Sequence, residues 1–143
     1  MSVGRSIEVA VTFVWLGMVL AISFLEAPLK FRAPNVTLPI GLGIGRLVFR
    51  ALNTAEVVFA LVTGAIALAG PTPMRIIVAL AVAVAMLAVQ LVAVRPRLTK
   101  RSDQVLAGSD GPRSHAHYVY VALETVKVVA LLAAGILLLQ VQG

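Results

Sequence analysis

The chain has 143 residues, of which 60% are hydrophobic and 13% are charged, and its mean hydropathy is +1.01. These values exclude an ordinary soluble globular domain. The absence of cysteine excludes disulfides, thiolate metal sites and iron–sulfur clusters, and we expect no metal and no cofactor. The formal charge of +6 could suggest a nucleic-acid partner, but the positions of the basic residues argue against one.

Four stretches qualify as membrane spans, each of which needs about 20 largely apolar residues. They lie near residues 7–27, 47–69, 75–94 and 118–140. The first is retained as a span because its uncharged core, residues 9–25, is longer than a typical signal-peptide core. We therefore predict one domain over residues 1–143, an all-α integral membrane four-helix bundle, because helices satisfy their own backbone groups in lipid.

The connections between the spans carry proline and glycine. Pro28 should end the first span, since a proline inside a helix removes a hydrogen bond and clashes with the preceding turn. A glycine-rich loop over residues 41–45 precedes the second span. The short Pro71-Thr72-Pro73 turn should make the second and third spans neighbours.

Most basic residues lie in or beside the first and third loops. These are Lys30, Arg32, Arg46 and Arg50 in the first, and Arg95, Arg97, Lys100, Arg101 and Arg113 in the third, whereas the termini and second loop contribute only Arg5 and Arg75. This bias predicts that loops one and three are cytoplasmic and that both termini lie outside the cytoplasmic membrane of a bacterium. The basic side chains are then expected to set topology and contact anionic lipid headgroups rather than nucleic acid.

Two segments of the chain match each other without gaps. Residues 51–68 and 122–139 share eight of eighteen residues at an offset of 71, which places Asn53 opposite Glu124 and Glu56 opposite Lys127. We interpret this as a tandem duplication of a helical hairpin, a parallel internal repeat about an axis along the membrane normal. Chance similarity between helices rich in Ala, Val and Leu is the alternative.

The spans contain a predicted intramembrane polar cluster, made of Asn53, Glu56, Gln90, Glu124 and Lys127. Glu56 and Lys127 lie roughly 13–15 Å deep, near the membrane centre. Because a central charge costs about 2.5–3.5 kcal/mol, we expect Lys127 to bridge Glu56 and Glu124 while the two amides add hydrogen bonds. Two carboxylates that share one ammonium favour a retained proton on one of them. Both a static structural role and proton-coupled chemistry fit this pattern.

The first hairpin carries short motifs, namely Gly17, Phe24, Ala27-Pro28, Phe31-Arg32, Gly45-Arg46 and Phe49. In these positions the chain resembles a family of small four-span membrane proteins of unassigned function, which includes the transmembrane proteins linked to platinum-drug resistance. The resemblance implies a polytopic bundle and no defined reaction.

The sequence offers no nucleophile with a matching base. We therefore expect a non-enzymatic accessory or assembly subunit of a larger membrane complex, first a lipid-transport system and then a respiratory assembly. Its partners would be membrane lipids and other integral membrane subunits. The alternative is a homo-oligomeric small transporter or proton-coupled carrier that uses Glu56, Lys127 and Glu124.

Overall fold

The computed structural model of the chain describes residues 2–108 and 115–142. Within these ranges the secondary structure is helical: α1 Val3–Val19, the π-helical η1 Leu20–Glu26, α2 Ala27–Leu29, the 3₁₀-helical η2 Lys30–Arg32, α3 Leu38–Ala69, α4 Met74–Val89, the π-helical η3 Gln90–Val94, α5 Arg95–Leu106 and α6 His115–Gln142. The predicted all-α fold is confirmed.

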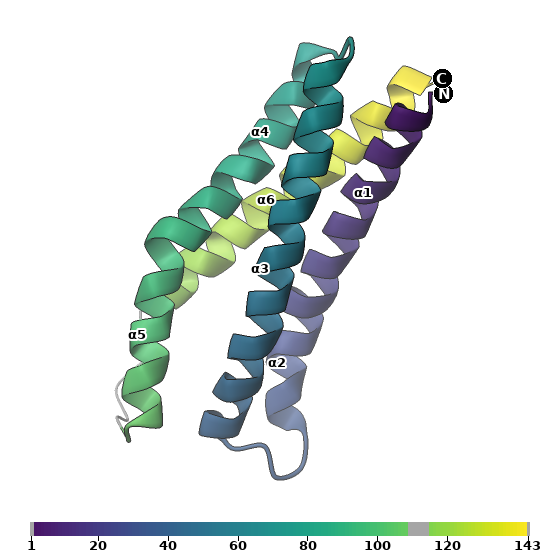
Figure 1. Cartoon of the computed structure of the whole chain (residues 1–143). Helices are drawn as coiled ribbons and strands as arrows, with labels where there is room; N and C mark the ends of the chain where they lie inside the picture. The colour runs from purple at the N-terminus through teal and green to yellow at the C-terminus, as the bar shows by residue number, and fades with distance from the viewer. Residues whose placement is uncertain (1, 109–114, 143) are drawn as a thin grey trace.

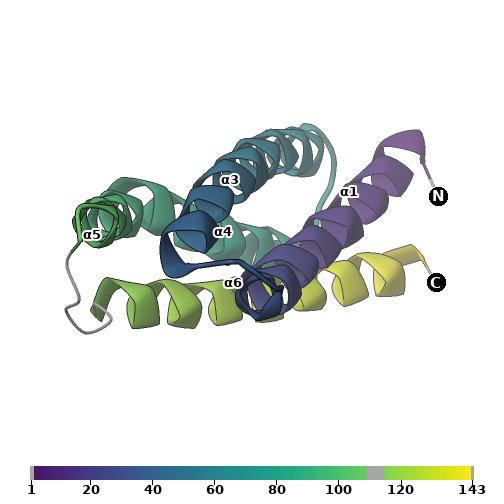
Figure 2. The same cartoon turned by 90° about the horizontal axis from the view of Figure 1, so that it is seen from below.

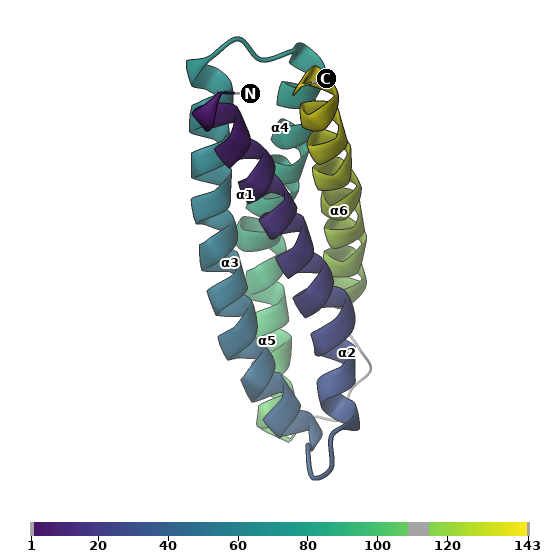
Figure 3. The ribbon, with the colours of Figure 1, turned by 90° about the vertical axis from the view of Figure 1, so that its right-hand side faces the viewer.

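Four continuous helices are long and apolar enough to cross a membrane, as expected for a multi-pass membrane protein. They cover Val3–Arg32, Leu38–Ala69, Met74–Leu106 and His117–Val141, so each begins or ends beyond the range expected from the sequence. The loop expected over residues 41–45 is wrong, because these residues belong to α3. Figures 1 and 3 show both termini at one end of the bundle, which we call the terminal end. The opposite end, which holds residues 30–50 and 95–106, is called the basic end.

The prediction that Pro28 ends the first span is wrong, because the helix continues through it to Arg32. The π-helical segment η1 precedes Pro28, and in it the Ala27 N–H donates to Ile22 O, five residues back. The same device precedes Pro96, where the Arg95 N–H donates to Gln90 O. In each case the wider turn changes which carbonyl oxygens accept hydrogen bonds just before the proline. The helix therefore accommodates the proline ring and its missing N–H, and it continues.

The helices pack as two pairs that meet through α1 and α6. Helix α1 packs on both α3 and α6, while α4 packs most extensively on α6. Figure 2, viewed from below, shows α6 alongside both α4 and α1. Helices α3 and α4 contact each other sparsely, although only the Gly70–Pro73 turn separates them. This pairing is compatible with two tandem hairpins, and the duplication itself stays a prediction.

Small residues allow the close packing of α4 and α6. The central apolar core contains Ala83 and Leu87 of α4, Ala130 and Leu131 of α6, and Trp15, Leu16 and Val19 of α1. A second core nearer the terminal end contains Ala67, Ile76, Leu80, Ala134 and Leu138. In lipid no hydrophobic force drives helices together, so the close approach that alanine permits contributes much of the association.

Gly135 and Gly64, which occupy matched positions in the two similar segments, provide a test of this packing. A Cβ atom at Gly135 would lie 2.6 Å from Cζ of Phe13, whereas one at Gly64 would have no contact within 4 Å. We expect Gly135→Leu to destabilise the bundle by about 1–3 kcal/mol through overpacking. Gly64→Leu should leave stability unchanged or slightly raised, because leucine has the higher helix propensity. Thermal unfolding in detergent measures both, and equal losses would contradict the packing of α1 on α6.

Candidate functional site: a buried ion cluster

The structure brings Glu56, Gln90, Glu124 and Lys127 together in the interior of the bundle. Lys127 Nζ lies 2.6 Å from Glu56 Oε1, 2.5 Å from Glu124 Oε1 and 2.8 Å from Gln90 Oε1. The four side chains are 0–1% exposed. An ammonium has three N–H donors, and each of these three oxygens can accept one. Lys127 therefore connects α3, η3 and α6 through one buried charge.

Helix α1 also contributes to the cluster, through two residues that the sequence analysis missed. Trp15 Nε1 donates to Glu56 Oε1 at 2.9 Å, and Ser23 Oγ donates to Glu124 Oε2 at 2.6 Å. Gln90 Nε2 donates to Glu124 Oε1 at 3.3 Å. With these bonds, polar groups of all four spans meet at one place.

A signal for this side of α1 was present in the sequence. Glu8, Thr12, Trp15 and Val19, which are spaced by three or four residues, are all buried, and Ser23 continues the series. Such spacing places residues on one helix face. A polar and aromatic stripe on an otherwise apolar helix therefore marks the face that lies against the other spans.

Asn53 does not add the hydrogen bond that we expected through its carbonyl oxygen. Asn53 is 8% exposed, and its Oδ1 accepts no hydrogen bond from the described residues. Glu56 Oε2 is buried and also lacks a donor. Because Asn53 and Glu56 are one turn apart on α3, two unpaired acceptor oxygens project from the same helix face.

The two π-helical segments supply two of the polar groups. Ser23 lies in η1 and Gln90 in η3, next to the turns in which the hydrogen-bond register widens. Such π-bulges occur frequently at functional sites because they change the direction of individual side chains. Here both segments direct a polar side chain toward Glu124.

A second buried ion pair lies nearer the terminal end and was not predicted. Arg5 Nη1 donates to Glu8 Oε2 at 2.6 Å, and Arg5 Nη2 donates to Pro71 O at 3.1 Å. Glu8 is fully buried, and its Oε1 has no partner among the described residues. The pair attaches the start of α1 to the turn between α3 and α4, and its spacing of three residues was the available signal.

At the basic end, two cations stack on aromatic rings. Lys30 Nζ lies 5.7 Å from the ring centroid of Phe49, and Arg95 Cζ lies 5.2 Å from the same centroid and 5.9 Å from that of Tyr120. These distances are within the range of cation–π attraction. Through Phe49 and Tyr120, Arg95 and Lys30 therefore connect all four spans at this end.

Glycines of the second span pack beneath residues of the first. A Cβ atom at Gly41 would overlap the ring of Phe31, and one at Gly45 would lie 2.9 Å from Lys30 Nζ. The motif residues Phe31 and Gly45 thus belong to the contact between the first and second spans.

Of the remaining basic residues singled out in the sequence, some contact another helix and others are exposed. Arg46 donates to Ser102 Oγ at 3.1 Å and forms an ion pair with Asp103, which fixes α3 to α5. Among the basic residues predicted in or beside the first and third loops, the exposed ones are Arg32, Arg50, Arg97 and Lys100. Arg101 is half-buried, and Arg113 lies outside the described residues.

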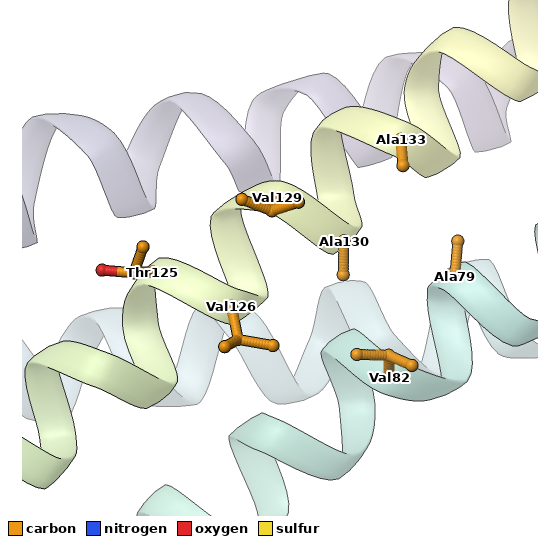
Figure 4. Close-up of a pocket in the computed structure, with 7 residues that line it drawn as sticks. All are labelled: Ala79, Val82, Thr125, Val126, Val129, Ala130 and Ala133. Carbon is orange, nitrogen blue, oxygen red and sulfur yellow. The ribbon is translucent and has the colours of Figure 1, made fainter.

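On the outer surface, a shallow hollow of about 340 Å³ lies between α4 and α6. Ala79 and Val82 of α4 line it on one side, and Val129 and Ala133 of α6 line it on the other (Figure 4). Thr125, which also lines it, donates its hydroxyl to Val121 O in its own helix. The hollow is therefore apolar and lies on the outer surface of the bundle.

Comparison of the chain with protein-family models, with curated proteins and with solved structures gives no match. The described residues also contain no group of three or more His, Cys, Asp or Glu side chains that could hold a metal ion. The resemblance to the platinum-resistance-associated family stays a prediction.

Lys127→Met tests the pairing of the cluster directly. The substitution leaves Glu56 and Glu124 buried without their counter-charge, and we expect it to destabilise the bundle by about 3–5 kcal/mol. Adding Glu56→Leu to Lys127→Met should recover part of that loss, because it removes one of the two buried acidic side chains that Lys127 contacts. Thermal unfolding of the two single variants and the double variant measures the coupling, and strictly additive effects would contradict it.

Proposed function

We propose that this chain is a non-enzymatic accessory or assembly subunit that docks on a larger complex in the membrane. A lipid-transport system is the first candidate for that complex, and a respiratory assembly is the second. Its partners would be other integral membrane subunits and the surrounding lipids.

The interior of the bundle supports a structural role for the cluster. Lys127, Glu124 and Gln90 bond to one another, and Trp15 and Ser23 add donors from α1. Side chains that are engaged in this way hold the spans in one arrangement. The surface that remains for recognition is the outer, lipid-facing one.

The hollow between α4 and α6 is the observation that carries the docking proposal. Its lining of alanine and valine allows the backbone of a further helix to approach closely, which is how helices associate in lipid. Val129 at this site is 62% exposed, so it is accessible to another helix.

We also propose that the basic end lies in the cytoplasm and that both termini lie outside the cytoplasmic membrane of a bacterium. The excess of Arg and Lys at the basic end supports this orientation. The exposed Arg32, Arg50, Arg97 and Lys100 would contact anionic headgroups there.

Site-specific photocrosslinking in native membranes tests the docking surface. A photoreactive amino acid at Val129, in the hollow, should crosslink to another polypeptide. The same group at Leu61, which is 68% exposed on α3 and outside the hollow, is the matched control and should give far less product. Copurification in gentle detergent should yield the same crosslinked partner. Equal products at the two positions, or a chain that elutes alone or only with itself, would contradict docking.

One observation favours the alternative of a proton-coupled carrier, which would act as a homo-oligomer. The cluster holds two carboxylates and one ammonium in the middle of the spans, an arrangement typical of proton relays in transporters.

Flux measurements in proteoliposomes test the carrier. We expect Glu56→Gln to abolish proton flux while the protein stays folded, because glutamine cannot exchange a proton. Asp103→Asn, which removes a carboxylate 63% exposed at the basic end, should leave flux unchanged. A pH-sensitive dye inside the vesicles reports both. Undiminished flux in Glu56→Gln would reject the carrier.

A further inference from the structure

We propose that the central cluster binds one proton between Glu56 Oε2 and Asn53 Oδ1. The site goes beyond docking, and it does not depend on whether the bundle has a partner. It assigns the proton to one of the two carboxyl groups and names the group that accepts its hydrogen bond.

The charged groups that contact one another around Glu56 have a net negative charge, which one additional positive charge would neutralise. Helix α6 presents Lys127 and Glu124, whereas α1 and η3 present the neutral Trp15 and Gln90. Tyr120 lies one turn from Glu124 on α6, and Arg95, which stacks on the Tyr120 ring, is a further cation that interacts electrostatically with Glu124. Within the directly bonded cluster, two carboxylates and one ammonium have a formal sum of −1, and an uncompensated charge in a buried site is strongly unfavourable. One bound proton brings the sum to zero.

Glu124 has no need of the proton, because both of its oxygens already accept hydrogen bonds. Oε1 accepts from Lys127 Nζ at 2.5 Å and from Gln90 Nε2 at 3.3 Å, and Oε2 accepts from Ser23 Oγ at 2.6 Å. This environment consists of donors and stabilises the ionised form. A proton on Glu124 Oε2 would reverse the bond with Ser23 from donor to acceptor, and it would leave Glu56 Oε2 and Asn53 Oδ1 without a donor.

Glu56 presents the opposite environment at its second oxygen. Oε1 accepts from Lys127 at 2.6 Å and from Trp15 at 2.9 Å, but Oε2 is buried without a donor. Asn53 Oδ1, one turn away on the same face of α3, is a second buried acceptor without a donor. Two acceptors cannot bond to each other. A proton on Oε2 turns Glu56 into a donor that Asn53 can accept, so one proton satisfies both groups.

A proton fits this position better than a metal cation. Hard cations bind six or more oxygen ligands at calcium and magnesium sites, whereas the free acceptors here are Glu56 Oε2 and Asn53 Oδ1. The residues that the structure describes form no group of three acidic or histidine side chains. The ligand is therefore a proton rather than an ion with a coordination shell.

A matched pair of glutamine variants tests the assignment through stability. Each variant replaces one carboxyl group by an amide of the same shape. In the proposed state Glu56 is neutral, so Glu56→Gln leaves the charge of the cluster unchanged, whereas Glu124→Gln removes the ionised carboxylate. Glu56→Gln reproduces the proposed state, because its amide N–H₂ replaces the O–H that faces Asn53, and we expect an unfolding temperature close to that of the original chain. Glu124→Gln places an amide among donors and should lower the unfolding temperature clearly. A larger loss in Glu56→Gln than in Glu124→Gln would overturn the assignment.

Infrared difference spectroscopy of the full chain at neutral pH tests the proton itself. The spectrum of the original chain minus that of Glu56→Gln should contain the carbonyl band of a protonated carboxyl group. The subtraction cancels any contribution from Glu8, which both proteins contain. Asn53→Leu should shift this band, and Ser23→Ala should leave it in place. The absence of the band, or a shift with Ser23→Ala alone, would overturn the proposal. So would loss of the band when sodium chloride replaces choline chloride, because a metal cation would then occupy the site.

Discussion

The buried ammonium of Lys127 is the constraint on which the arrangement of the spans depends. Lipid provides no hydrophobic force between helices, so small-residue packing and polar contacts decide which faces meet. Lys127 requires three acceptors inside the bundle, and it takes them from Glu56, Gln90 and Glu124. Helices α3 and α6 and segment η3 can satisfy this requirement in few relative orientations. If one side chain of this cluster is replaced, the remaining polar and charged groups lose a partner in an environment that cannot solvate them.

The two π-helical segments, η1 and η3, both contribute side chains to the Lys127 cluster. Pro28 and Pro96 each follow a π-helical segment, and these segments place Ser23 and Gln90 against Glu124. In a regular α-helix both side chains would point in other directions. The extra residue in a π-helical turn rotates the side chains about the helix axis. The two prolines are thus linked to the polar interior through the π-helical segments that precede them. The proline-linked segments also recur in the first and third spans, which is compatible with the predicted duplication.

The two proposals concern different parts of the molecule, the buried interior and the outer surface. In the interior, Glu56 Oε2 and Asn53 Oδ1 are buried acceptors without a donor among the described residues, and the proposed proton lies between them. Outside, the hollow between α4 and α6 presents alanine and valine to the membrane. The proposed docking depends on residues of the outer surface, whereas the proposed proton exchange depends on residues of the buried cluster.

The sequence alone determined the four spans and the meeting of Glu56, Glu124 and Lys127, because apolar length and opposite charges in hydrocarbon leave few alternatives. Only the tertiary structure decided that the helices continue through Pro28 and Pro96, that α4 packs on α6 rather than on α3, and that Trp15 and Ser23 join the cluster. It also left Asn53 Oδ1 unpaired. These features depend on the rotation of each helix about its axis, which is set by contacts between residues far apart in the chain.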